Sequence, residues 1–166
     1  MKAKLIIEGK EIEIEISEEE YKKLQPSEIG YERVPKSNGF YYANAKGDVG
    51  TGIDNYCYAD DKYYESANYY SSETVAENNA RADKLMRQLR RFSVEHRERG
   101  VNLNDTNTKK YYICYDYESN ELEATFTFVG RVFGIIYFDS EEAINAAIDE
   151  FRDELIWYFT EYKDSL

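Results

Sequence analysis

Residues 72–100 read SETVAENNARADKLMRQLRRFSVEHRERG and predict the longest helix of the chain. We expect it to run from about Glu73 to Arg99, because Ser71-Ser72 precedes it and Gly100 follows it. Side chains of one face recur at helical spacing: Val75, Ala82, Leu85, Met86, Leu89, Phe92 and Ser93. The stretch therefore predicts an amphipathic helix that covers an apolar core.

A second long helix is predicted from Asp139 or Ser140 to about Tyr162, where either residue can cap and Asp139 with Glu142 has the spacing of a capping-box variant. Its apolar stripe contains Ile144, Ala147, Ile148, Phe151, Leu155, Tyr158, Phe159 and Tyr162. The run 69–73 before the first long helix, YYSSE, echoes the run 137–141 before the second, YFDSE. This echo suggests a strand-to-helix unit used twice.

Apolar and polar residues alternate in a way that predicts three hairpins. In the first, a two-residue loop at Gly9-Lys10 pairs Ile7 with Ile12, and a capping box at 17–20 opens a short helix that ends near Gln25. The second joins residues 40–44 to 49–53. Residues 54–70 are expected to form a loop or an irregular strand.

The third hairpin joins residues 110–117 to 122–129. A loop at Ser119-Asn120 pairs Tyr117 with Leu122 and opposes Asp116 to Glu123. A nearly continuous apolar strand is expected next, at 133–138.

These elements predict an α+β fold: a mainly antiparallel sheet with two long helices, preceded by a β-hairpin and a short helix. Residues 1–30 form the expected hairpin-helix unit and residues 31–166 the α+β core, although one continuous domain fits equally well. Aromatic residues make up 16% of the 166, which argues against disorder. No signal sequence and no apolar run of roughly 20 residues is present, so we expect a cytoplasmic protein with Cys57 and Cys114 reduced.

Signals for catalysis, phosphate binding and metal binding are weak. The glycine-rich run 47–52 does not open a helix with a following Lys-Ser/Thr, so a hairpin arm explains it better than a phosphate cradle. Three aspartates, Asp54, Asp60 and Asp61, are too irregular for a calcium loop and are expected to be solvated. His96, on the apolar stripe of the first long helix, is expected to be packed or hydrogen-bonded. We expect no enzyme, no cofactor and no metal site.

Charge is distributed unevenly over the chain. The net charge of −12 divides into −7 over residues 1–80, +4 over 81–99 and −9 over 100–166. Nucleic acid repels such an acidic chain overall, whereas basic protein grooves attract it. We therefore expect a protein partner with a basic nucleic-acid-binding groove, and direct nucleic-acid binding is less expected.

Two acidic groups are candidates for partner binding. Trp157 is expected to point away from the apolar stripe, either as an interface anchor or packed beneath another element such as the N-terminal hairpin. The carboxylates expected around it are Glu150, Asp153, Glu154, Glu161 and Asp164. The tip of the third hairpin carries a second group: Asp116, Glu118, Glu121 and Glu123.

One basic patch is expected on the first long helix, formed by Lys84, Arg87, Arg90 and Arg91. It can be a solvated face that Asp83 and Glu95 partly neutralise at helical spacing. Alternatively, it can contact RNA phosphates or an acidic partner.

Three motifs carry a resemblance: residues 68–77 (NYYSSETVAE), residues 110–116 (KYYICYD) and residues 134–143 (GIIYFDSEEA). Over residues 38–160 the chain resembles a family of small acidic proteins carried by phages and conjugative elements of Firmicutes. Such proteins often resemble inhibitors of host defence, including type II anti-CRISPR proteins that mimic nucleic acid in the basic channels of Cas9-type effectors. The resemblance implies such an inhibitor in the host cytoplasm. The alternative is a nucleic-acid-associated accessory protein that uses the basic helix at 81–99.

Overall fold

The computed structural model of the chain describes residues 2–7, 10–15, 17 and 29–163. Within these residues the fold is α+β, as predicted, with four helices and three antiparallel strand pairs. Each pair is a separate two-stranded sheet, so the single antiparallel sheet that the sequence suggested does not form among them. The predicted capping box at 17–20 and the short helix to Gln25 lie outside the described residues.

The first hairpin pairs β1 (Lys2–Ile7) with β2 (Lys10–Glu15). The strands meet at Ile7 and Lys10, and Leu5 pairs with Ile12. The predicted pairing of Ile7 with Ile12 is wrong by two residues. An alternating sequence pattern repeats every two residues, so it does not distinguish two registers that differ by two.

The second hairpin confirms the prediction and pairs β3 (Gly39–Ala43) with β4 (Val49–Ile53). Its turn is held by the side chain of Asn44, whose Oδ1 accepts hydrogen bonds from the backbone of Lys46 at 2.8 Å and of Asp48 at 3.1 Å. Such self-bonding turns are typical of asparagine, so the connection is encoded locally.

The third hairpin pairs β5 (Lys110–Asp116) with β6 (Glu121–Thr127). Tyr115 pairs with Leu122 and Asp116 with Glu121, so the predicted register is again wrong by two residues. The carboxylate of Asp116 accepts hydrogen bonds from the backbone of Glu118 at 2.8 Å and from the hydroxyl of Ser119 at 3.0 Å. These bonds make residues 117–120 the turn, in place of the predicted two-residue loop.

A helix, α2 (Tyr58–Glu65), occupies the stretch where a loop or irregular strand was predicted. The side chain of Asp60, in the first turn, fixes the start of this helix. Its Oδ2 accepts hydrogen bonds from the backbone of Asn55 at 2.9 Å and of Cys57 at 3.2 Å. Carboxylates in the first turn of a helix also interact favourably with its dipole. The prediction failed because the tyrosines give this short helix no clear apolar period.

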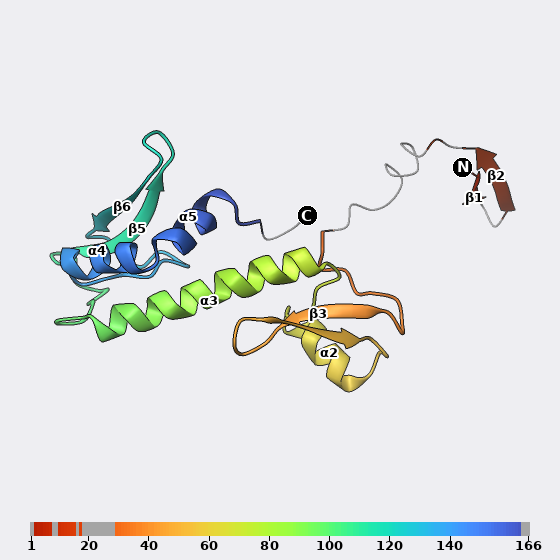
Figure 1. The fold of residues 1–166 in the computed structure, drawn as a ribbon, viewed down its shortest axis with the longest axis horizontal. Coiled ribbons are helices and arrows are strands. Elements are labelled where there is room, and N and C mark those ends of the chain that lie inside the picture. The colour runs from red at the N-terminus through yellow and green to blue at the C-terminus, as the bar shows by residue number, and fades with distance from the viewer. Residues whose placement is uncertain (1, 8–9, 16, 18–28, 164–166) are drawn as a thin grey trace.

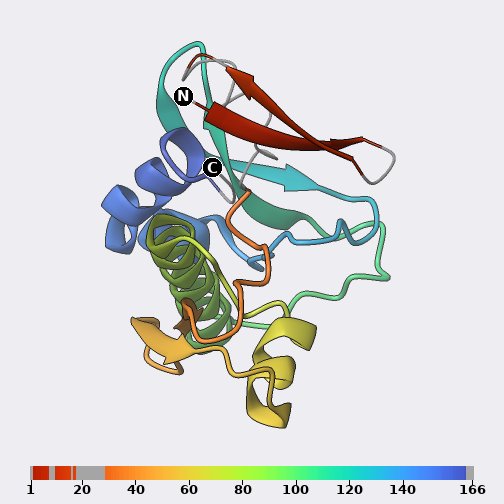
Figure 2. The same ribbon diagram turned by 90° about the vertical axis from the view of Figure 1, so that its right-hand side faces the viewer.

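The long helix α3 (Glu73–Glu95) is the axis around which the other elements gather. Figure 1 shows β3–β4 and α2 beside its N-terminal half, and β5–β6, α4 and α5 beside its other half. Figure 2, which looks nearly down α3, shows α4 and α5 packed along it. The helix ends before the predicted Arg99, because Asp139 Oδ2 accepts hydrogen bonds from the backbone of Arg99 at 2.8 Å and of Gly100 at 2.9 Å.

The predicted strand at 133–138 does not form. Only Phe138 makes a bridge, to Tyr111 of β5, and Gly134 with φ +83° interrupts the extended backbone. The predicted final helix is divided into α4 (Glu141–Glu150) and α5 (Arg152–Thr160), with the break at Phe151. Ser140 caps α4 by accepting a hydrogen bond from the backbone of Ala143 at 3.1 Å. The predicted capping-box variant at Asp139 is therefore wrong. The carboxylate of Asp139 instead binds the backbone of Arg99 and Gly100, after the end of α3.

The echo between the runs 69–73 and 137–141 corresponds to a repeated arrangement. In each case a hairpin is followed by a single residue that bridges its first strand, Tyr70 to Tyr41 and Phe138 to Tyr111. Two residues later a serine caps a helix, Ser72 for α3 and Ser140 for α4. The strand-to-helix unit thus occurs twice, each time with a bridging residue and, two positions later, a serine that caps the helix.

Two apolar clusters lie along α3. The smaller joins Tyr70, Val75 and Ala76 to partly buried residues of β3 and β4. The larger joins α3 to α4, α5 and the β5–β6 hairpin, and its buried members are Leu85, Leu89, Phe138, Ala143, Ile144, Ala147, Ile148 and Leu155. The predicted apolar stripes of both long helices supply most of these side chains.

Candidate protein-binding surface

Trp157 is buried, with 8% of its surface exposed, so it is not an exposed interface anchor. The guanidinium of Arg81 on α3 lies over its ring at 3.9 Å from the centroid, and the ring of Tyr162 lies 5.6 Å away. The alternative prediction, that Trp157 packs beneath another element, is correct, but the covering side chain that the structure shows comes from α3. A cation above an indole face is a favourable contact that no local pattern reveals.

Glu154 was predicted to be one of the free carboxylates around Trp157, but it is paired with Arg81. Its two carboxylate oxygens accept hydrogen bonds from Arg81 Nε at 2.7 Å and Nη2 at 3.0 Å. This pairing lowers the pKa of Glu154 and raises that of Arg81. Three other predicted members remain exposed, namely Glu150, Asp153 and Glu161. Asp164 lies outside the described residues.

The tip of the β5–β6 hairpin forms the second acidic group. Glu118, Glu121 and Glu123 are exposed, whereas Asp116 is half-buried and stabilises the turn. Its hydrogen bonds to Glu118 and Ser119 lower the pKa of Asp116. The predicted opposition of Asp116 to Glu123 is wrong, since Glu123 lies opposite Cys114.

A hydrogen bond joins the two acidic groups. The hydroxyl of Tyr117, at the hairpin tip, donates to the carbonyl oxygen of Phe159 in α5 at 2.9 Å. The ring of Tyr115 also stacks on that of Phe159, with 5.9 Å between centroids. The hairpin tip therefore lies against the C-terminal part of α5. We call the exposed carboxylates of the hairpin and of the residues in and next to α5 the acidic surface: Glu118, Glu121, Glu123, Glu150, Asp153 and Glu161.

All four residues of the predicted basic patch are exposed on α3. Arg91 pairs with Glu95 at 3.7 Å, as its spacing predicts. The predicted Asp83 to Arg87 pair is absent from the ion pairs between described residues. Lys84 and Arg87 instead lie against Gly47 of the β3–β4 turn, where a Cβ would come within 3.0 Å of Lys84.

The prediction of solvated aspartates is wrong for Asp60, which is 8% exposed, and for Asp54, which is fully buried. Arg33 donates to its two carboxylate oxygens at 2.9 and 3.2 Å, and the hydroxyl of Tyr69 donates at 2.9 Å. These contacts, with Arg33 as the main cause, lower the pKa of Asp54 to about 2. Asp61 also binds Arg33, at 2.8 Å, so these carboxylates organise a structural network.

The same geometry accounts for the glycine-rich run. Gly50 and Gly52 lie on β4, where a Cβ would meet the rings of Tyr42 at 2.5 Å and Phe40 at 2.6 Å. The glycines therefore make room for aromatic rings across the hairpin. No group of three or more His, Cys, Asp or Glu side chains within the described ranges is arranged to hold a metal ion.

Lys110 is a buried cation that the sequence analysis overlooked. Its Nζ donates to three carbonyl oxygens, of Asp105 at 2.6 Å, Thr108 at 3.3 Å and Phe128 at 3.0 Å. All three ammonium protons are thus used to hold loops together. The alternating pattern of β5 offers no signal that this lysine points inward.

His96 confirms the expectation of a hydrogen-bonded histidine. It ends α3, its Nδ1 lies 3.1 Å from the carbonyl oxygen of Phe92, and its ring stacks on Phe92 at 3.8 Å. Cys57 and Cys114 are both free thiols, as predicted.

Comparisons with known proteins provide no further guide: no family model, curated protein or solved structure matches the chain. None of the helices in the described ranges has the length and apolar character needed to cross a membrane.

Proposed function

We propose that this chain is a binding protein that docks its acidic surface onto the basic nucleic-acid groove of another protein. The observation that carries the proposal is six exposed carboxylates, three in the β5–β6 hairpin and three in or next to α5, with the hairpin and α5 joined through Tyr117 and Phe159. None of the six takes part in an ion pair with another described residue. Carboxylates left without cations on a rigid support can imitate phosphates, and they steer association with a basic partner.

The resemblance to small acidic proteins of phages and conjugative elements makes the proposal more specific. The partner is a Cas9-type effector of the host bacterium, and the chain is an anti-CRISPR inhibitor encoded by a mobile element. Such effectors hold nucleic acid in a positively charged channel, which the acidic surface complements. This role requires no catalytic residue, cofactor or metal.

Binding to a purified type II effector at low and high salt tests the proposal. We expect binding that weakens as salt rises, because screening acts on exposed charges. A variant with Glu118→Gln, Glu121→Gln and Glu123→Gln should bind at least tenfold more weakly. The matched control carries Glu65→Gln, Glu77→Gln and Glu98→Gln, which neutralise three exposed carboxylates outside the acidic surface and should leave affinity unchanged.

Two results would contradict the proposal. One is the absence of binding to the effector, with and without guide RNA, at either salt concentration. The other is equal affinity of the triple variant and the wild type.

A second candidate function uses the basic patch. Lys84, Arg87 and Arg90 are exposed and take part in no ion pair between described residues. This supports a nucleic-acid-associated accessory role, with tyrosines as stacking partners. A gel-shift measurement separates the two: RNA or DNA binding that is lost on Arg87→Gln/Arg91→Gln would favour the accessory role.

A further inference from the structure

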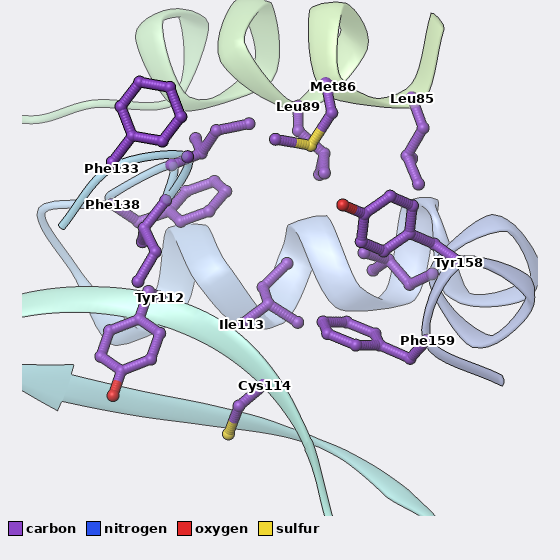
Figure 3. Close-up of a pocket in the computed structure, with 14 residues that line it drawn as sticks. Leu85, Met86, Leu89, Tyr112, Ile113, Cys114, Phe133, Phe138, Tyr158 and Phe159 are labelled. Carbon is purple, nitrogen blue, oxygen red and sulfur yellow. The ribbon is translucent and has the colours of Figure 1, made fainter. Parts of the chain in front are cut away.

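A hollow of about 390 Å³ lies between α3, β5 and α5. Figure 3 shows Met86 of α3, Ile113 of β5 and Phe159 of α5 around it. Its lining is mainly apolar, and the hydroxyl of Tyr158 is a polar group that points into it. This volume and this lining are typical of pockets for small ligands, which span roughly 300–1,000 Å³.

A second hollow, of about 610 Å³, adjoins the first. The two share Phe133, Gly134, Ile135 and Ile136 as lining residues, so the segment 133–136 borders both. The second adds Arg90 and Arg131, and Arg90 follows Met86 by one helical turn. Two arginine side chains therefore line the hollow that adjoins the apolar one.

The two arginines have charge available for a ligand. Both are exposed, and neither appears in the ion pairs found among residues 29–163. By contrast Arg33, Arg81, Arg91 and Arg152 each pair with a carboxylate. Guanidinium groups bind carboxylates and phosphates through two parallel hydrogen bonds.

The loop beside the hollow is apolar and exposed. Val129 is 75% exposed, Val132 52% and Phe133 wholly exposed. Gly130 and Gly134 lie on either side of Val132 and Phe133 at positive φ, and a Cβ at either glycine would meet nothing within 4 Å. Clustered exposed apolar side chains mark ligand or partner sites. The loop thus offers apolar surface to cover a bound molecule.

We propose that this hollow binds a small amphipathic anion, with an aliphatic body between α3 and β5 and a single acidic head at Arg90 and Arg131. The ligand class follows from charge complementarity at the mouth and apolar lining within. The site is separate from the acidic surface, so it adds a small-molecule ligand to a protein proposed to bind a macromolecule.

Calorimetric titration with dodecanoate, below its micelle concentration, tests this. We expect wild-type protein to bind it and the Arg90→Gln/Arg131→Gln variant to bind at least tenfold more weakly, because charged hydrogen bonds to the head are lost. The matched control is Arg87→Gln/Arg91→Gln, which removes two exposed arginines of the same helix that do not line the hollow. It should bind like the wild type.

Two further measurements sharpen the test. Dodecanol lacks the charged head, so its affinity should be equal in the wild type and in Arg90→Gln/Arg131→Gln. Met86→Trp should fill the chamber and abolish dodecanoate binding, with near-ultraviolet circular dichroism to report that the protein remains folded. Because both arginines are exposed, their variant tests the site even if Met86→Trp does not fold.

Three outcomes would overturn the inference. Folded wild-type protein does not bind dodecanoate, or Arg90→Gln/Arg131→Gln and Arg87→Gln/Arg91→Gln lose dodecanoate affinity equally. The third is binding of an acidic peptide without any binding of dodecanoate. The triple variant of Glu118, Glu121 and Glu123 should retain dodecanoate binding. The two proposals can therefore fail independently.

Discussion

The two ends of α3 are stabilised by different chemistry. At the N-terminal end, aromatic rings of β3, α2 and the segment before α3 pack around a buried ion pair between Asp54 and Arg33. At the other end, aliphatic side chains of α4 and α5 pack on Leu85 and Leu89, and a hollow remains beside them. The stability of the first end depends on the positions of a few polar atoms. The stability of the second depends on how completely apolar side chains fill the core.

This difference has a consequence for substitutions. Removing one partner of a buried ion pair lowers the free energy of unfolding strongly, because the remaining charge is left without compensation. An aliphatic core responds in proportion to the volume that is deleted and to how well the surroundings collapse. The two ends should therefore respond differently to substitutions of similar size.

The largest effect is expected for Asp54→Ala. It removes the acceptor of Arg33, of the hydroxyl of Tyr69 and of the backbone of Tyr56, while Arg33 keeps Asp61. The loss of these hydrogen bonds should lower the free energy of unfolding by about 3–5 kcal/mol. Urea denaturation measures this. The control is Asp61→Ala, which removes the more exposed partner of Arg33 and should have an effect of about 0–1 kcal/mol. An equal effect of the two would refute a special role for the buried carboxylate.

Ile144→Ala tests the aliphatic end. Ile144 is fully buried in the larger cluster, so the substitution should lower the free energy of unfolding by about 2–5 kcal/mol. Met86→Ala is the comparison, because Met86 is half-buried and borders the existing hollow, and its effect should be about 1 kcal/mol. If Met86→Ala proves as damaging as Ile144→Ala, the hollow is filled in solution.

The pH dependence of stability should separate the two ends further. The pKa of Asp54 is about 2 in the folded protein, below its ordinary value of 3.8, so the unfolded chain binds its proton first as pH falls. Its contribution is complete above about pH 5 and is lost as pH falls through about 2. Thermal unfolding across this range should show a shallower acid loss for Asp54→Asn than for the wild type. Parallel profiles would contradict this assignment.

The smallest effects are expected at the two matched caps. Ser72 accepts from the backbone of Val75 at 3.4 Å and Ser140 from that of Ala143 at 3.1 Å. Each Ser→Ala substitution should lower the free energy of unfolding by about 1 kcal/mol, and each Ser→Gly by only a few tenths. A much larger effect at one cap would show that the two units are not equivalent.

Much of the local structure was predictable from short-range chemistry. The apolar stripes of α3 and of residues 144–159 were correct, because helical spacing puts such residues on one face whatever they pack against. The hairpins were found, but two registers were wrong by two residues, because a shift of two preserves the apolar face and only the turn chemistry decides between them. The acid-rich hairpin tip was predicted for the same local reason.

The details of the sites depend on contacts distant in sequence. Trp157 is covered by Arg81, which lies 76 positions earlier, and Asp54 is buried by Arg33 and Tyr69. The hollow combines Met86, Ile113 and Phe159 with a loop that was predicted to be a strand. Residue types and periodicity therefore specify which faces are apolar and where charge is abundant. Which charges are neutralised and which cavities stay open follows from three-dimensional packing, because those outcomes depend on partners that no local pattern identifies.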